Sequence, residues 1–196
     1  MYATLSQLKA DRNLKPGDVA ETLGYYEPGD GGAAAYAITG TAPDPAAGEA
    51  SVDLGDGRHA VLVKPEVVTY RMFGAVGDGQ ADDVGKIAAA HAYANRHGLP
   101  VVNLSGRFRL GEPETIIIQT PVQWGQTVFY IDESRNSKTA PRFLVSASQP
   151  PAEILLSDEE KAELLKLLVP GTAIIPQLAP YKNCLVVVRD ENDLIG

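Results

Sequence analysis

The chain has 196 residues, a formal net charge of −8 and 44% hydrophobic residues. Its length fits one or two domains, and its hydrophobic fraction is too high for a disordered chain. The negative charge argues against nucleic acid as a partner, because affinity for a phosphate backbone comes largely from Lys and Arg. No apolar run approaches the ~20 residues that cross a bilayer, so we expect no membrane insertion, and no signal peptide is recognisable.

The numbers of glycine, proline and cysteine residues narrow the possible folds further. Nineteen glycines and fourteen prolines indicate many turns and short strands. Cys184 is the single cysteine, which excludes an internal disulfide and a cysteine-based zinc cluster. The apolar segment 185–188 follows it, so we expect its thiol to be buried and to pack as a small apolar group.

A short helix followed by strands is predicted for the N-terminal part. Thr4 and Gln7 have the spacing of a capping box, and the helix they open would run to about Asn13 and bury two leucines, Leu5 and Leu8. Apolar segments separated by turns indicate strands at 19–23, 35–39, 52–54 and 60–63. The last two flank Gly-Asp-Gly, which is a hairpin signal. Residues 1–66 are therefore expected to form a small β-rich leader domain.

The most informative run extends from Phe73 to Asp83. Its glycines let the backbone turn with positive φ. Asp82 and Asp83 can accept hydrogen bonds from the free amides of a following helix, whose positive end favours carboxylates. We interpret these residues and Asp78 as a structural cap. Calcium, which takes several oxygen ligands, is the alternative, but the spacing is not that of an EF-hand, and we expect no metal or other cofactor.

The rest of the chain alternates helices and short apolar segments. A helix is expected from Asp83 to about His97. One of its faces, which would point into the core, carries Val84, Ile87, Ala88, His91 and Ala94. A linker strand is expected before it at 67–70. Strands are expected after it at 101–104, 108–110, 115–119, 127–131 and 143–145. A second capping box predicts a helix at 157–168, with strands at 174–175 and 184–188. Such segments are typical of β-helix coils or of a β-sandwich.

The run Phe73–Asp83, with Ile87 and the segment Gly106–Leu110, resembles the opening of pectate-lyase-like, single-stranded right-handed β-helix proteins. This superfamily includes polysaccharide lyases, glycoside hydrolases and phage tailspikes. The loop at 23–32 also resembles the leader that often precedes these β-helices. There are departures: Val84 replaces the usual Thr, and His91 stands where an aliphatic residue is common.

The resemblance covers roughly residues 4–110 and implies a mainly β fold. Residues 1–66 would be the leader domain, and residues 67–196 the N-terminal cap and first coils of a right-handed parallel β-helix, with the chain a truncated N-terminal portion of a longer protein. It implies a polysaccharide as partner. It also implies an extracellular, cell-surface or periplasmic location, with a virion tail as the alternative.

Two functions follow from the resemblance. The parent protein would be a polysaccharide lyase or glycoside hydrolase whose catalytic carboxylates lie on later coils, with this portion inactive by itself. Alternatively, the chain would be an attachment or trimerisation module of a tailspike or a carbohydrate-binding adhesin, acting as a homotrimer.

The residues themselves assign no catalytic or carbohydrate-binding site. Adjacent Asp132 and Glu133 would point to opposite faces of a strand and cannot form the carboxylate pair of a glycosidase. The three histidines lack metal-ligand spacing, and we expect His91 to pack beneath the cap or to bond a backbone carbonyl. Four aromatic residues could stack on sugars, although core packing is the simpler interpretation: Tyr25, Tyr26, Tyr36 and Trp124.

Overall fold

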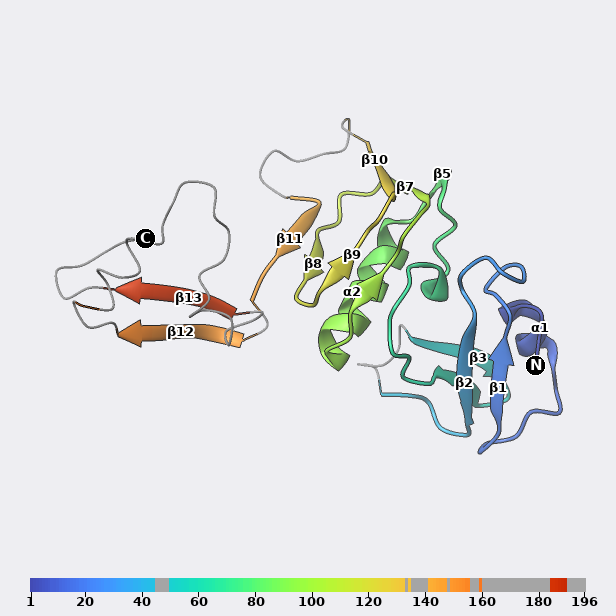
Figure 1. The fold of residues 1–196 in the computed structure, drawn as a ribbon. Coiled ribbons are helices and arrows are strands. Elements are labelled where there is room, and N and C mark those ends of the chain that lie inside the picture. Colours follow the sequence, from blue (N-terminus) through green and yellow to red (C-terminus); the bar gives the residue numbers. More distant parts are fainter. Residues whose placement is uncertain are drawn as a thin grey trace. The chain divides into compact units, whose positions relative to one another are not determined.

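The structure is a computed structural model that describes residues 1–44, 50–132, 134, 141–147, 149–155, 159 and 184–189 (Figure 1). It is mainly β, with two α-helices among the described residues, α1 (Leu5–Ala10) and α2 (Val84–His97). It divides into two compact units, Met1–Leu144 and Val145–Gly196. The predicted boundary near residue 66 falls inside the first unit.

The first helix begins at the predicted capping box. The Thr4 hydroxyl accepts a hydrogen bond from the Gln7 amide at 3.2 Å, and the Gln7 side chain accepts one from the Ala3 amide at 3.0 Å. These bonds satisfy amides that have no partner within the helix. Leu5 and Leu8 are buried as predicted. The helix ends at Ala10, three residues earlier than expected.

The leader sheet is antiparallel and has the strand order β1-β2-β4-β3. Its strands are β1 (Val19–Thr22), β2 (Ala34–Thr39), β3 (Ser51–Gly55) and β4 (Arg58–Leu62). The predicted hairpin between β3 and β4 is confirmed, and Gly55, Asp56 and Gly57 all have positive φ in its turn. Alternate residues of β2 and β4 are buried, which gives the sheet one core face.

Parallel pairing dominates the rest of the first unit. The strands are β5 (Asp78–Asp82), β6 (Val101–Val102), β7 (Arg107–Leu110), β8 (Ile116–Ile118), β9 (Val122–Gln123), β10 (Val128–Ile131) and β11 (Phe143–Val145). They pair in the orders β10-β7-β5, β6-β9 and β11-β8.

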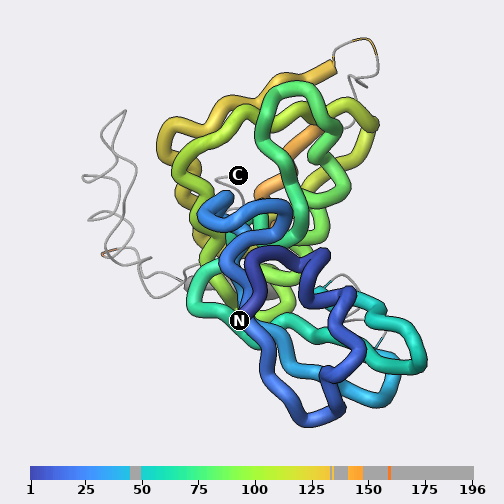
Figure 2. The backbone as a smooth tube through the Cα atoms, turned by 90° about the vertical axis from the view of Figure 1, so that its right-hand side faces the viewer, coloured from blue at the N-terminus to red at the C-terminus, as the bar shows by residue number. Residues whose placement is uncertain are grey.

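Two of these pairs repeat one spacing along the chain. Val101 pairs with Val122 and Arg107 with Val128, so partners lie 21 residues apart in both (122 − 101 and 128 − 107). Figure 2 shows the backbones of β7 and β10 running side by side. The chain therefore makes one circuit and returns beside itself in the same direction. Phe108 and Leu110 of β7 are fully buried inside this circuit.

The helix α2 has the predicted bounds. Gly98, in the left-handed conformation with φ 65°, ends it, and its amide bonds the Ala94 carbonyl. The buried face differs from the predicted stripe, because Ala90 and Tyr93 are also buried whereas Ala88 is only partly buried. Tyr93 packs against Phe73 with ring centroids 5.6 Å apart. Phe73 belongs to the 3₁₀ helix η2 (Arg71–Phe73).

Two predictions before α2 are wrong, one of a strand and one of a turn. Instead of a linker strand at 67–70, Val68 makes a single parallel bridge to Val101. Tyr70 already has helical φ and ψ (−62°, −32°), so the extended conformation stops there and η2 follows. In addition, residues 78–82, expected as a turn, form β5 by pairing with β7.

In the second unit, β12 (Gln149–Leu155) and β13 (Cys184–Arg189) form a parallel pair with a register shift between Gln149 and Ala152. The strand β13 was predicted, and β12 was not. The predicted helix at 157–168, except Glu159, the strand at 174–175 and the environment of the Cys184 thiol lie outside the described residues. Within the described part of the chain, no helix is long and apolar enough to cross a membrane.

Candidate functional site

The Asp83 carboxylate holds a turn, not the helix. It accepts hydrogen bonds from the amides of Val76 at 2.7 Å and Gly77 at 3.0 Å. The predicted bond from Asp83 to a helix amide is wrong: Asp83 occupies the N-cap position, but its side chain makes no cap bond. Its backbone is helical (φ −101°, ψ −1°), whereas a capping residue is typically extended. Burial raises the pKa of Asp83, and the two amides oppose that rise.

The Asp82 carboxylate links α2 to the turn that follows β7. It accepts hydrogen bonds from the amides of Val84 at 3.2 Å, Gly111 at 2.9 Å and Glu112 at 3.0 Å. A Cβ on Gly111 would lie 2.8 Å from the Asp82 carboxylate, so this approach requires glycine. Asp82 therefore contacts a helix amide, and it also fastens two segments almost 30 residues apart.

Asp78 closes a local turn and has no contact with the helix amides. Its carboxylate accepts hydrogen bonds from the amides of Gln80 at 2.8 Å and Ala81 at 2.9 Å, and these bonds lower the pKa of Asp78. The three carboxylates thus bind backbone amides at three different turns. Within the described residues, no group of three His, Cys, Asp or Glu side chains is placed to hold a metal ion.

A buried chain of hydrogen bonds joins Trp124, Tyr70 and His91. The Trp124 indole N–H donates to the Tyr70 hydroxyl at 2.7 Å, and that hydroxyl lies 2.9 Å from His91 Nε2. Since indole only donates, the Tyr70 hydroxyl accepts the first bond, whereas the direction of the second depends on the His91 tautomer; the buried Nδ1 of His91 bonds no described residue. Burial lowers the pKa of His91 to about 4. This partner was not predicted, because a tyrosine 21 residues away gives no local signal.

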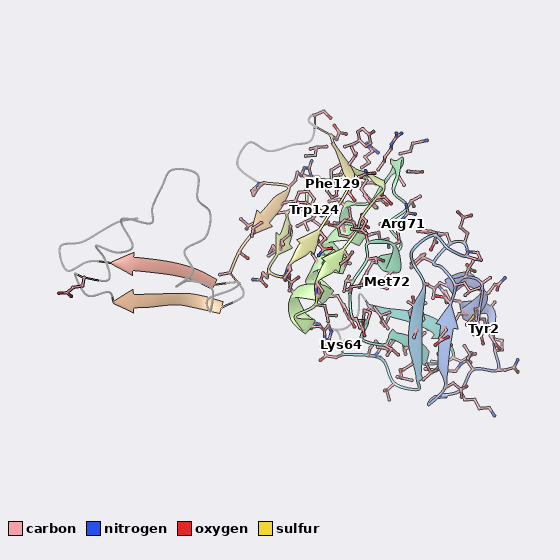
Figure 3. All side chains as sticks on the ribbon, viewed as in Figure 1. Tyr2, Lys64, Arg71, Met72, Trp124 and Phe129 are labelled. Carbon is pink, nitrogen blue, oxygen red and sulfur yellow. The ribbon has the colours of Figure 1, made fainter. Side chains whose placement is uncertain are left out.

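Most of the candidate aromatic residues belong to the core. Tyr36 is 3% exposed, and Trp124 packs against Phe129 and Phe143 with ring centroids 5.5 and 5.4 Å away (Figure 3). Tyr25 is partly buried and meets Tyr26 edge to face. Of the four, Tyr26 alone is 54% exposed, while its hydroxyl donates to the Gly74 carbonyl.

The acidic residue of the glycine-rich loop, Asp30, also makes its hydrogen bonds to backbone amides. The Asp30 carboxylate accepts hydrogen bonds from the amides of Tyr25, Tyr26, Glu27 and Gly32. Burial would raise the pKa of Asp30, but these amides outweigh it and the pKa is lowered. Asp30 therefore stays ionised and shapes the loop.

A polar hollow lies beside this loop. Its volume is about 400 Å³, and its walls come from three segments: Gly29–Gly31, Thr69 with Arg71, and Val102–Ser105. This volume is within the ~300–1,000 Å³ of sites for small ligands. Sequence reasoning did not single out Arg71 (Figure 3), which is partly buried in this wall.

The nearest approach to a catalytic arrangement is an ion pair. Arg109 and Asp132 lie 3.5 Å apart on the neighbouring strands β7 and β10 and their ends. Their side chains are 41% and 25% exposed, so the pair is partly solvated. Glu133 lies outside the described residues. No catalytic residue is assigned.

Comparison with known proteins identifies the fold. No family model and no curated protein matches the chain. Among solved structures, WceF of Pantoea stewartii, a glycan biofilm modifying enzyme with a bacteriophage tailspike-like parallel β-helix fold, matches with a TM-score of 0.51 and 20% identity, over 78% of this chain and 24% of that one.

Two phage proteins match less closely. Tailspike protein gp49 of the Acinetobacter baumannii bacteriophage Fri1, a capsular polysaccharide depolymerase, has a TM-score of 0.44 and 18% identity over 62% of this chain and 22% of its own. The enzymatically active domain of tailspike protein 2 of bacteriophage CBA120 matches with a TM-score of 0.45 and 11% identity. That match covers 100% of this chain and 27% of the tailspike domain. The chain thus spans about a quarter of these structures. The predicted resemblance is confirmed as a likeness of fold to a tailspike-like β-helix protein.

Proposed function

We propose that the chain is the N-terminal portion of a β-helix protein that acts on a polysaccharide, and that this portion carries no catalytic site of its own. In this proposal, residues 1–66 are the leader domain, and residues 67–196 contain the cap and the first coils of a right-handed parallel β-helix. The chain works without a metal or other cofactor, outside the cytoplasm or on a virion tail.

The observation that carries the proposal is the spacing that two of the parallel pairs share. Both Val101–Val122 and Arg107–Val128 are 21 residues apart. A chain that returns beside itself in parallel register after a constant number of residues forms a coil, and stacked coils bury a continuous core. The likeness of fold to WceF supports the same architecture.

The placement of α2 supports the role of a cap. The helix lies between Val68 and Val101, which pair directly. It therefore occupies an insertion in the first circuit, and its contacts include β6, β7 and β8. Its residues Val84, Ile87 and Ala94 are buried, as a helix that covers the open end of a first coil requires.

The hydrogen bonds of four carboxylates support the proposal that this portion is non-catalytic. The carboxylates of Asp30, Asp78, Asp82 and Asp83 all accept hydrogen bonds from backbone amides. A general acid or base needs a group free to exchange a proton with the substrate. These four residues stabilise turns instead.

The proposal is tested with the purified chain and a panel of neutral and acidic polysaccharides. Retention is measured by co-sedimentation, and turnover by new reducing ends and by unsaturated products that absorb in the ultraviolet. We expect retention on at least one polysaccharide and no turnover. Retention on none would refute the polysaccharide partner, and turnover that disappears in a single-residue variant would refute the non-catalytic assignment.

An association module is the second candidate. It is favoured by apolar side chains of the first unit that β10 and β11 leave exposed: Val128, Tyr130, Ile131 and Leu144. Exposed apolar groups on successive strands are typical of a surface that another chain or coil covers. Sedimentation equilibrium distinguishes the two: a stable trimer would support this candidate, whereas a monomer up to high micromolar concentration would contradict it.

A further inference from the structure

We infer that the polar hollow beside η2 binds the carboxylate of an acidic sugar residue through Arg71. This inference rests on the proposed polysaccharide partner and adds a site and a chemical class to it. The hollow, which we call the Arg71 hollow, is lined by Gly29, Asp30, Gly31, Thr69, Arg71, Val102, Asn103, Leu104 and Ser105.

The Arg71 side chain is held in place by two glycine turns. A Cβ on Gly31 would lie 3.2 Å from the Arg71 Cδ, and one on Gly77 would lie 3.1 Å from its terminal nitrogen. Both glycines have positive φ, 87° and 69°. The stem of the arginine therefore packs against one turn while its guanidinium reaches the other, which limits the side-chain freedom that ligand binding would otherwise remove.

The guanidinium of Arg71 is a cation without a counterion among the described residues. The ion pairs of the described part of the chain involve Arg12, Arg58 and Arg109, and the side-chain hydrogen bonds found there include none from Arg71. Arginine presents donors in a planar fork that matches a carboxylate with two parallel hydrogen bonds. A partly buried arginine with no partner is thus prepared for an anionic group.

Some of the other polar side chains that line the Arg71 hollow already make hydrogen bonds within the protein, and others do not. The Thr69 hydroxyl donates to the Gly31 carbonyl and accepts from the Met72 amide. The Asp30 carboxylate is occupied by four backbone amides. The Ser105 hydroxyl is exposed and makes no hydrogen bond to a described residue. Arg71 and Ser105 are therefore lining residues whose side-chain donors bind no described residue.

The ionised Asp30 carboxylate lies in the same wall, although the four amides disperse part of its charge. Its repulsion of an anion and the attraction of Arg71 both grow with the charge of the ligand. The choice of a carboxylate therefore rests on shape, because its planar pair of oxygens matches the fork of Arg71.

Isothermal titration of the whole chain with trigalacturonate tests this site. Methyl-esterified trigalacturonate, which has the same rings without the charge, is the matched ligand control. We expect the acidic trimer to bind and the ester to bind at least tenfold more weakly. We also expect binding of the acid to weaken as NaCl is raised from 50 to 500 mM, because exposed charges are screened by salt.

Two variants locate the site. Arg71→Gln should weaken binding of the acidic trimer about tenfold, and Ser105→Ala should weaken it a few-fold without touching the arginine. Arg96→Gln, at an exposed position of α2, removes one positive charge elsewhere and should leave the affinity unchanged. Circular dichroism and melting temperature establish that each variant is folded.

The outcomes separate this inference from the proposed function. If Arg71→Gln and Ser105→Ala bind the acidic trimer as the wild type does, or if the wild type prefers the ester or a sulfated trisaccharide, the Arg71 site is overturned. Retention of the wild type on polysaccharide would then leave the proposed function standing. If trigalacturonate binds in a manner that depends on Arg71, but the chain is retained on no polysaccharide, the Arg71 site is sustained and the proposed function is overturned.

Discussion

Replacing Asp83 by alanine should destabilise the first unit more than the loss of an ordinary helix cap would. Asp83 is 1% exposed, and its carboxylate accepts two amide hydrogen bonds, at 2.7 and 3.0 Å. A buried donor left without a partner costs about 1–3 kcal/mol, and these two amides are partly buried. Removal of the carboxylate also removes the cost of its burial, which offsets part of this loss. We therefore expect the unfolding free energy to fall by about 2–4 kcal/mol.

Urea unfolding followed by circular dichroism measures this difference, and a parallel melt should show a decrease of ~2–4 °C for each kcal/mol. Asp83→Asn keeps one acceptor oxygen and should lose about half as much. Glu66→Ala is the charge-matched control, because Glu66 is exposed and makes no hydrogen bond to a described residue. The reasoning is refuted if Asp83→Ala is as stable as Glu66→Ala. Calcium-dependent stability of the wild type that disappears in Asp83→Ala would favour the metal alternative.

Three further predictions concern stability, pH and activity. Asp82→Ala should cost about 0.5–2 kcal/mol, as for a lost N-cap, and should speed hydrogen exchange at Gly111; unchanged exchange there would contradict the link to α2. His91 has a folded-state pKa of about 4, below its unfolded value of about 6.5. Its stabilising contribution is therefore present above pH 6.5 and is lost as the pH falls toward 4, by about 3 kcal/mol. His91→Gln should flatten the stability profile in that window relative to the wild type, and parallel profiles would refute this assignment. Finally, the chain should release no products from pectin or alginate in reducing-end and ultraviolet assays, and turnover abolished by Asp132→Asn would show that the Arg109–Asp132 pair is catalytic.

Local signals in the sequence determined the helices and the leader hairpin. Thr4 and Gln7 predicted the start of α1, and Gly98 predicted the end of α2. These features depend on residues a few positions apart, whose conformational preferences act whatever the rest of the chain does. The resemblance carried by Phe73–Asp83 added the class of fold, which the likeness to WceF confirms.

Tertiary structure decided which partners these local elements use. The Asp83 carboxylate reaches back to the turn at Val76, although its position predicted helix amides. His91 bonds the hydroxyl of Tyr70, because α2 packs over that residue. In both cases burial leaves a polar group no water to bond, so the partner is the group that packing brings within reach.

The sequence also could not supply the register of the parallel strands. The strands β6 and β9 have two residues each, too few for a pattern of alternation, and each becomes a strand by pairing with the other 21 positions away. The Arg71 hollow is similar, since its walls come from three segments that span residues 29–105. Composition and caps act locally and are readable along the chain, whereas strand pairing and hollows arise from contacts between distant segments and exist only once the core has formed.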